Sequence, residues 1–271
     1  MPTLLQIALL LISAGLFAAC AAAALLKDRG HSTNMVARGV WMCRGVAIAL
    51  AIVSLILHSA DRGSFWPLED NFDALVWLAV MLGIVVAYIQ LRHPIGGLDL
   101  FAAPIVVLML LSAAFFGSNL PRDYHLYSAW LTVHRVCSFG GVVMFAVAAA
   151  TSTAWLISND RLRRKQLAAA RRVGSLEQLE RVNYLMVTLG FAMLSVGLIT
   201  GFGRLTIVPA DERIQWLASP KITLAAVAWL VYALVLHAPI NPVFRGKRVA
   251  QLSIGGFLLI TGVVVAVQFN V

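Results

Sequence analysis

Eight long apolar segments, separated by short polar stretches, are the feature that most constrains how this chain can fold. Each approaches or exceeds the roughly 18–25 residues that a helix needs to cross a hydrocarbon layer about 30 Å thick. Their composition is rich in Ala, Leu and Val and lacks the alternation of a transmembrane strand. We therefore predict an all-α, polytopic bundle of eight spans, which cover residues 3–26, 39–59, 73–91, 98–117, 126–157, 182–203, 219–237 and 248–270.

Lys and Arg are distributed unequally between the two sides of this predicted bundle. The polar stretches after the first, third, fifth and seventh segments hold 14 of them, and those after the second, fourth and sixth hold 5. Because loops rich in Lys and Arg stay in the cytoplasm, both termini are predicted on the outer, periplasmic side. The same bias accounts for the net charge of +9, so we do not expect the chain to bind nucleic acid.

The polar stretches are too short to form a soluble domain. The longest, 158–181, has 24 residues, so we predict a single transmembrane domain over 1–271 that lies in the bacterial inner (plasma) membrane, in contact with the lipid bilayer. The three cysteines form no CxxC, which excludes a thioredoxin-like centre and a CxxCH haem-attachment site. We find no catalytic triad, phosphate-binding glycine loop or carboxylate pair in a segment, and we predict no catalytic residues.

Three of the six histidines lie at or within the ends of apolar segments, where an ionisable group is costly and indicates a function. In the predicted topology His58 and His134 both lie near the outer face. His237 ends the seventh segment at the cytoplasmic face, too far along its helix to share a ligand with them. The other three, His31, His93 and His125, fall in predicted loops.

Two interpretations of these histidines are open. Neutral imidazole binds iron well, and two axial histidines can hold a haem, so His58 and His134 could bind one iron between them. The cations on the same predicted outer side, Arg62, Arg122, Arg135 and Arg204, could then pair with the haem propionates. Alternatively, each ring is an interfacial residue that bonds a backbone carbonyl.

Several short motifs occur in an order and at spacings typical of one family. They are Trp130-Leu-Thr-Val-His134, the stretch 175–184, Gly197-Leu-Ile-Thr-Gly201, Ser219-Pro-Lys-Ile-Thr223, and Leu236-His237 followed by Arg245-Gly-Lys-Arg248. Through them the chain resembles the cytochrome c assembly protein family over essentially its whole length. Leu57-His58 and the eight-segment layout resemble the small YpjD/HemX-like branch of that family.

The resemblance implies a haem-handling protein that receives haem b in the membrane and works with other cytochrome c maturation proteins. It places His134 and His237 at the family's histidine positions, and His58 at that of the early helices in the small branch. Our leading hypothesis takes His58 and His134 as haem-iron ligands, Arg135 and Arg204 as propionate partners, and His237 as an inner-face ligand or gate. Full assembly proteins carry a tryptophan-rich haem-presenting motif where the stretch 204–218 has a single tryptophan. We therefore expect a maturation accessory or haem carrier.

Two other functions are open at this stage. Some HemX-like relatives suggest a membrane regulator of tetrapyrrole biosynthesis, which would bind a cytosolic tetrapyrrole enzyme through the basic stretch 158–181. A small-solute transporter is the third possibility. The broken helices of such transporters carry paired Gly and Pro, however, and in this chain Pro104 alone interrupts an apolar segment.

Overall fold

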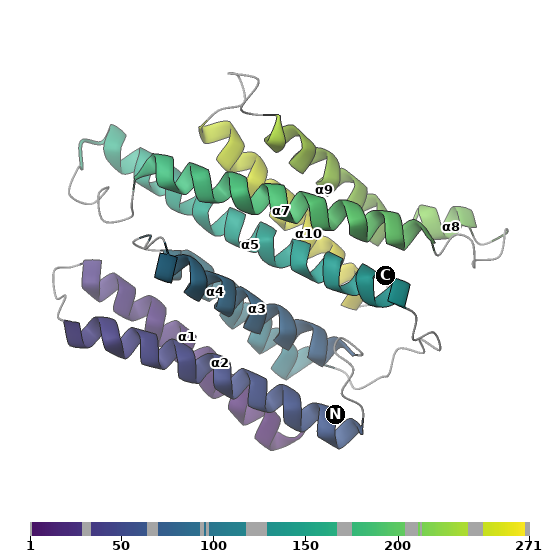
Figure 1. Ribbon diagram of the computed structural model, residues 1–271, viewed down its shortest axis with the longest axis horizontal. Helices are drawn as coiled ribbons and strands as arrows, with labels where there is room; N and C mark the ends of the chain where they lie inside the picture. The colour runs from purple at the N-terminus through teal and green to yellow at the C-terminus, as the bar shows by residue number, and fades with distance from the viewer. Residues whose placement is uncertain are drawn as a thin grey trace. The chain divides into compact units, whose positions relative to one another are not determined.

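The computed structural model is helical throughout the part of the chain that it describes (Figure 1). The described residues are 2–28, 34–63, 70–92, 95, 98–117, 129–166, 175–203, 211, 213–237 and 246–268. Within these residues there is no strand, which confirms the all-α prediction.

The helices follow the predicted apolar segments closely. They are α1 (Leu4–Asp28), α2 (Asn34–Arg62), α3 (Asn71–Arg92), α4 (Leu98–Phe116), α5 (Ala129–Arg163), α7 (Leu176–Phe202), α8 (Arg213–Leu217), α9 (Pro220–Leu236) and α10 (Lys247–Gln268). Seven of them are long and apolar enough to cross a membrane, and the chain is a multi-pass membrane protein.

The predicted seventh span, 219–237, corresponds to the shorter helix α9, which is apolar but only 17 residues long. Proline accounts for both limits. Pro220 occupies the first turn, where its missing N–H costs nothing, and Pro239 follows shortly after the helix ends. By its length, α9 is therefore a marginal span.

The described chain divides into two compact units. The N-terminal unit comprises residues 1–123 and 157–178, and the C-terminal unit comprises 124–156 and 179–271. The prediction of one domain over 1–271, and that of both termini on the outer side, stay predictions.

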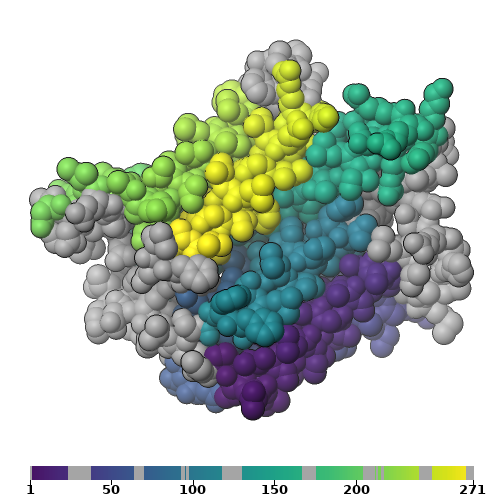
Figure 2. Space-filling model, turned by 180° about the vertical axis from the view of Figure 1, so that it is seen from behind, coloured from purple at the N-terminus to yellow at the C-terminus, as the bar shows by residue number. Residues whose placement is uncertain are grey.

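In the N-terminal unit α1 and α2 form an antiparallel hairpin. The Ser13 hydroxyl donates to the carbonyl of Ala47 at 2.8 Å, and the Ser54 hydroxyl donates to that of Gln6 at 3.2 Å. Thr3 and Gln6 cap the start of α1 reciprocally, each backbone N–H donating to the other side chain. Helix α4 also lies against α1, as the teal and purple helices of Figure 2 show, and α3 lies against α4.

In the C-terminal unit α5, α7, α9 and α10 pack around a small aromatic core. The rings of Phe145 and Tyr232, both fully buried, stack with their centroids 3.6 Å apart. The Tyr232 hydroxyl donates to the carbonyl of Ser253 on α10, and α10 lies along α9 (Figure 2). Tyr232 of α9 therefore contacts both α5, through Phe145, and α10, through Ser253.

Candidate functional site

The start of α3 is set by Asp70, which is the N-cap of that helix. Oδ1 of Asp70 accepts the backbone N–H of Asp73 at 2.8 Å, the pattern by which a short acidic side chain satisfies the first turn of a helix. The carbonyl of Asp70 accepts the N–H of Ala74 at 3.1 Å. Capping holds the Asp70 carboxylate in place and leaves its other oxygen, Oδ2, to contact α2.

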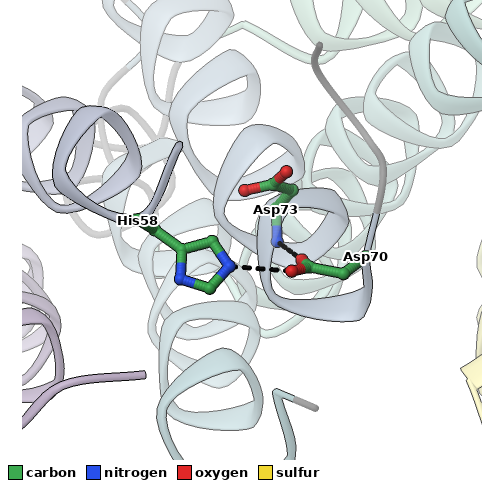
Figure 3. Close-up of side chains that lie close together, drawn as sticks. All are labelled: His58, Asp70 and Asp73. Carbon is green, nitrogen blue, oxygen red and sulfur yellow. Dashed lines mark hydrogen bonds and ion pairs between the residues drawn. The ribbon is translucent and has the colours of Figure 1, made fainter. Parts of the chain in front are cut away.

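That second oxygen is the centre of a buried polar cluster (Figure 3). Nε2 of His58, near the end of α2, lies 2.7 Å from Oδ2 of Asp70, and the ring of Phe72 packs on the imidazole with centroids 4.4 Å apart. The guanidinium of Arg62 donates to Oδ2 of Asp70 at 3.2 Å and to Oδ2 of Asp73 at 2.6 Å. His58, Asp70 and Asp73 are each at most 3% exposed.

The surroundings of Asp70 shift its acidity in two opposing directions. Burial favours the neutral acid and raises the pKa of the carboxyl. The hydrogen bonds from His58 and from the backbone of Asp73, together with the charges of His58 and Arg62, outweigh burial, so the pKa of Asp70 is lowered below its usual value of 3.8. Asp70 is therefore a carboxylate at neutral pH.

The contact with Asp70 limits how His58 could bind a haem. A carboxylate only accepts hydrogen bonds, so a neutral His58 carries its proton on Nε2, and its lone pair is on Nδ1, nearer the helix backbone. In this arrangement His58 could hold an iron only through Nδ1, or after releasing Asp70.

His134 on α5 has the opposite arrangement and fits a haem ligand better. Its Nδ1–H donates to the carbonyl of Gly197 at 2.8 Å, with the Thr200 hydroxyl oxygen 3.3 Å away. In a neutral ring this bond leaves the lone pair on Nε2, the nitrogen farther from the backbone. A backbone carbonyl bound to Nδ1 is a common way to orient a metal-binding histidine. The ring is half-buried.

The glycines of α7 serve helix packing. A Cβ atom at Gly190 would lie 2.8 Å from the ring of Phe145, one at Gly197 would lie 2.8 Å from the Ser138 hydroxyl, and one at Gly201 would lie 3.2 Å from the ring of His134. These glycines allow α7 to approach α5 closely. The close approach also brings the Gly197 carbonyl within reach of His134.

Of the three remaining predicted site residues, the structure describes His237 and Arg135 but not Arg204. His237 is exposed and is the C-cap of α9, with its Nδ1 bonded to the carbonyl of Ala233 at 2.7 Å. Arg135 follows His134 on α5 and is half-buried, and Arg204 lies outside the described residues.

The second interpretation, in which each histidine ring bonds a backbone carbonyl, therefore holds for one nitrogen of His134 and one of His237. It does not hold for His58, whose Nε2 contacts Asp70. His58 belongs to the N-terminal unit and His134 to the C-terminal unit. Because the two units are described separately, a shared iron between His58 and His134 stays a prediction.

Comparison with known families identifies the chain. The model of the family described as "Cytochrome C assembly protein" matches residues 65–269, which is most of the sequence. The chain belongs to the cytochrome c assembly protein family. The resemblance seen in the sequence motifs is thereby confirmed, and assignment to the small YpjD/HemX-like branch stays a prediction.

The chain is similar to cytochrome c biogenesis proteins of Prochlorococcus and Synechococcus. The chain is 28% identical over 241 residues to the cytochrome c biogenesis protein CcsA of Prochlorococcus marinus (strain NATL2A), covering 76% of this chain and 74% of that protein. It is 26% identical over 245 residues to CcsA of Synechococcus sp. (strain CC9902), covering 79% and 78%. No solved structure matches the chain significantly.

Sequence reasoning missed the partners of His58 in this family member. In the sequence, Arg62 and Asp70 are charged residues between the second and third segments, and Asp73 begins the third segment. No motif indicated that the three side chains contact one another. A signal was present, because two consecutive spans joined by a short loop bring the end of one helix beside the start of the next. Charges on both sides of that loop, close to a histidine, are the pattern that predicts such a network.

Proposed function

We propose that this membrane protein handles haem during cytochrome c maturation and that His134 binds the haem iron. Membership of the cytochrome c assembly family over residues 65–269 and a multi-pass helical architecture support the role. The observation that carries the choice of ligand is the bond from Nδ1 of His134 to the carbonyl of Gly197.

The chemistry of that bond is what an axial ligand requires. A histidine must be neutral and must present one lone pair to bind iron. The Gly197 carbonyl holds the Nδ1–H, restrains the ring about its χ angles and increases the electron density on Nε2. The adjacent Thr200 hydroxyl lies 2.7 Å from the carbonyl of Val196 and 3.0 Å from that of Gly197, and its oxygen is 3.3 Å from Nδ1 of His134.

The cofactor that we propose is haem b, held without covalent attachment because the sequence has no CxxCH. The haem would be the cargo that the protein carries. The protein would orient the haem and provide positive charges for its propionates. Arg135, adjacent to His134, and Arg204 are the cations that we propose for the propionates. His237 is the proposed inner-face ligand or gate.

His58 is the proposed second ligand, under the condition stated above that it uses Nδ1 or releases Asp70. We also propose both termini on the outer side, location in a bacterial inner membrane and membership of the small branch. The bound haem would then lie near the outer face, where maturation partners act. We propose a carrier or accessory role because the stretch 204–218 has one tryptophan.

The visible spectrum of the full-length protein tests the ligand. The protein is purified in mild detergent, supplied with haem, and compared as wild type, His134→Gly and His93→Ala. We expect a low-spin Soret band in the wild type and in the His93→Ala control, and its loss in His134→Gly. Added imidazole should restore the band in His134→Gly, which a merely structural role of His134 would not allow.

Two results would contradict the proposal. A wild-type protein that stays colourless after haem addition would contradict the haem-handling role. A Soret band unchanged in His134→Gly would reject His134 as the ligand, and the same spectrum recorded on His58→Ala then reports whether the second proposed position binds the iron.

A further inference from the structure

The buried cluster around Asp70 has the composition of a cation site. One imidazole nitrogen from His58 and one carboxylate oxygen each from Asp70 and Asp73 all lie within 4.8 Å of one another. They come from two helices and the N-cap residue between them, so the backbone of α2 and α3 fixes their spacing (Figure 3). Phe72, which is fully buried, packs on the imidazole, and His58 itself is only 3% exposed.

The charges within this cluster balance only when His58 is protonated. Two carboxylates face the single guanidinium of Arg62, whose Nη1 contacts Oδ2 of both. With His58 neutral, the described part of the cluster carries one excess negative charge. A buried excess charge is costly, and a cation is the usual means of offsetting it.

A second observation points independently to a missing ligand. Oδ1 of Asp73 is buried and has no hydrogen-bond partner among the described residues, although Asp73 is 1% exposed. A carboxylate oxygen removed from water normally accepts a hydrogen bond or binds a metal. Asp73 therefore presents an oxygen within the cluster that the described contacts do not use.

We propose that in the haem-free protein, where His58 holds no iron, His58, Asp70 and Asp73 bind a divalent transition-metal ion such as Zn²⁺. One nitrogen and two carboxylate oxygens suit Zn²⁺ or Co²⁺, whose bonds to these atoms are about 2.0–2.2 Å, and a histidine is an uncommon ligand for Ca²⁺ or Mg²⁺. Ligand atoms within 4.8 Å of one another converge on such an ion with small side-chain rotations.

When the metal ion binds, it takes the place of the Arg62 guanidinium between the two carboxylates. The proton of a neutral His58 moves to Nδ1, so that Nε2 and Oδ2 of Asp70 share the metal in place of a hydrogen bond. The two positive charges balance the two carboxylates, and Arg62, whose side chain is 18% exposed at the end of α2, withdraws toward solvent. The guanidinium and the metal thus compete for one position.

The test is a titration with Zn²⁺ of the full-length protein, freed of haem and treated with a chelator, in mild detergent. Isothermal calorimetry measures the number of ions bound and their affinity. We expect the wild type to bind one ion, and His58→Ala and Asp73→Asn to bind at least about tenfold more weakly. Asp61→Asn is the matched control, because exposed Asp61 neighbours Arg62 but bonds Gln6 instead, and its affinity should equal the wild type.

The competing guanidinium provides a second, opposite readout. Arg62→Met should bind Zn²⁺ on the order of tenfold more tightly, because it removes the resident cation. A misfolded protein would lose affinity for Zn²⁺, so a gain in Arg62→Met cannot result from misfolding. The gain should disappear in Arg62→Met/Asp73→Asn, which lacks one of the proposed ligands. Co²⁺ should give ligand-field bands without the charge-transfer bands of a thiolate.

The proposal is overturned if the wild type and Arg62→Met bind no Zn²⁺, or if Asp73→Asn and His58→Ala bind it as tightly as the wild type. Thiolate bands in the Co²⁺ spectrum would also overturn it by placing the metal on a cysteine. The proposed role of His134 is independent of each of these outcomes.

Discussion

Oδ2 of Asp70 lies 2.7 Å from Nε2 of His58, and both side chains are almost fully buried. The contact joins the end of α2 to the start of α3 and sets the tautomer of a neutral His58. It therefore determines both the stability of this helix pair and the nitrogen that His58 can offer to a metal.

Replacing Asp70 by Asn should destabilise the protein at neutral pH. Asn retains the size of Asp and part of its capping ability, but it removes the charge that pairs with Arg62. Loss of one partner from a buried ion pair costs on the order of 3–5 kcal/mol, less here because Arg62 keeps Asp73. Thermal unfolding in detergent, compared with Asp61→Asn, measures the difference.

The stabilising effect of Asp70 should disappear in acid. Its folded pKa is lowered, so its contribution is fully present above the unfolded value of 3.8 and is lost as the pH falls through the folded value. Unfolding midpoints measured from pH 6 downward should converge between wild type and Asp70→Asn below about pH 3.8. A constant difference throughout that range would show that the charge of Asp70 contributes nothing.

The ion pair between α2 and α4 should respond differently to single and double replacement. Arg44 and Asp99 lie 2.6 Å apart with side chains 5% and 15% exposed. Arg44→Met leaves the half-buried Asp99 without its guanidinium partner, at a cost below the roughly 3–5 kcal/mol of a fully buried pair, whereas Arg44→Met/Asp99→Leu should recover most of that loss. Denaturant unfolding of the wild type, Arg44→Met, Asp99→Leu and the double variant gives the coupling energy. Equal losses in Arg44→Met and the double variant would contradict the prediction.

Helix packing in the C-terminal unit should be sensitive to a single methyl group at Gly190. A Cβ atom there would lie 2.8 Å from the Phe145 ring, which is held by stacking on Tyr232. Gly190→Ala should therefore cost about 1–3 kcal/mol. Gly255→Ala is the control, since a Cβ at Gly255 meets nothing within 4 Å, and it should leave the unfolding midpoint unchanged or slightly raised.

A buried amide joins three helices of the same unit. The Asn183 side chain donates to the carbonyl of Ala148 at 2.8 Å and to the Ser152 hydroxyl at 2.6 Å, and it accepts from the Ser253 hydroxyl at 3.4 Å. Asn183→Leu should cost about 1–3 kcal/mol, because it leaves buried polar groups unpaired.

Thr188→Val on the exposed side of α7 provides the comparison. Its hydroxyl bonds only the carbonyl of Tyr184 in its own helix, so the change should stay within about 0.5 kcal/mol. Similar unfolding midpoints for Asn183→Leu and Thr188→Val would show that the amide network adds no stability.

The sequence alone located the long helices, although α2, α5 and α7 extend five to six residues beyond the predicted segments at one end. The third predicted segment, 73–91, and α3 (Asn71–Arg92) differ by at most two residues at either end. A helix in lipid must satisfy its own backbone, so a continuous apolar run marks its extent directly. The start of α7 is also encoded locally, because the Ser175 hydroxyl accepts the backbone N–H of Gln178 at 3.1 Å, as the first half of a capping box does.

The partners of each histidine were decided by tertiary structure. His58 and Asp70 are twelve residues apart in the sequence, and His134 and Gly197 are sixty-three apart. Which nitrogen of an imidazole is engaged depends on helix rotation and on the close approach that Gly197 and Gly201 allow. Apolar composition specifies that a segment is a helix, but only packing against neighbouring helices selects which of its faces meets which polar group.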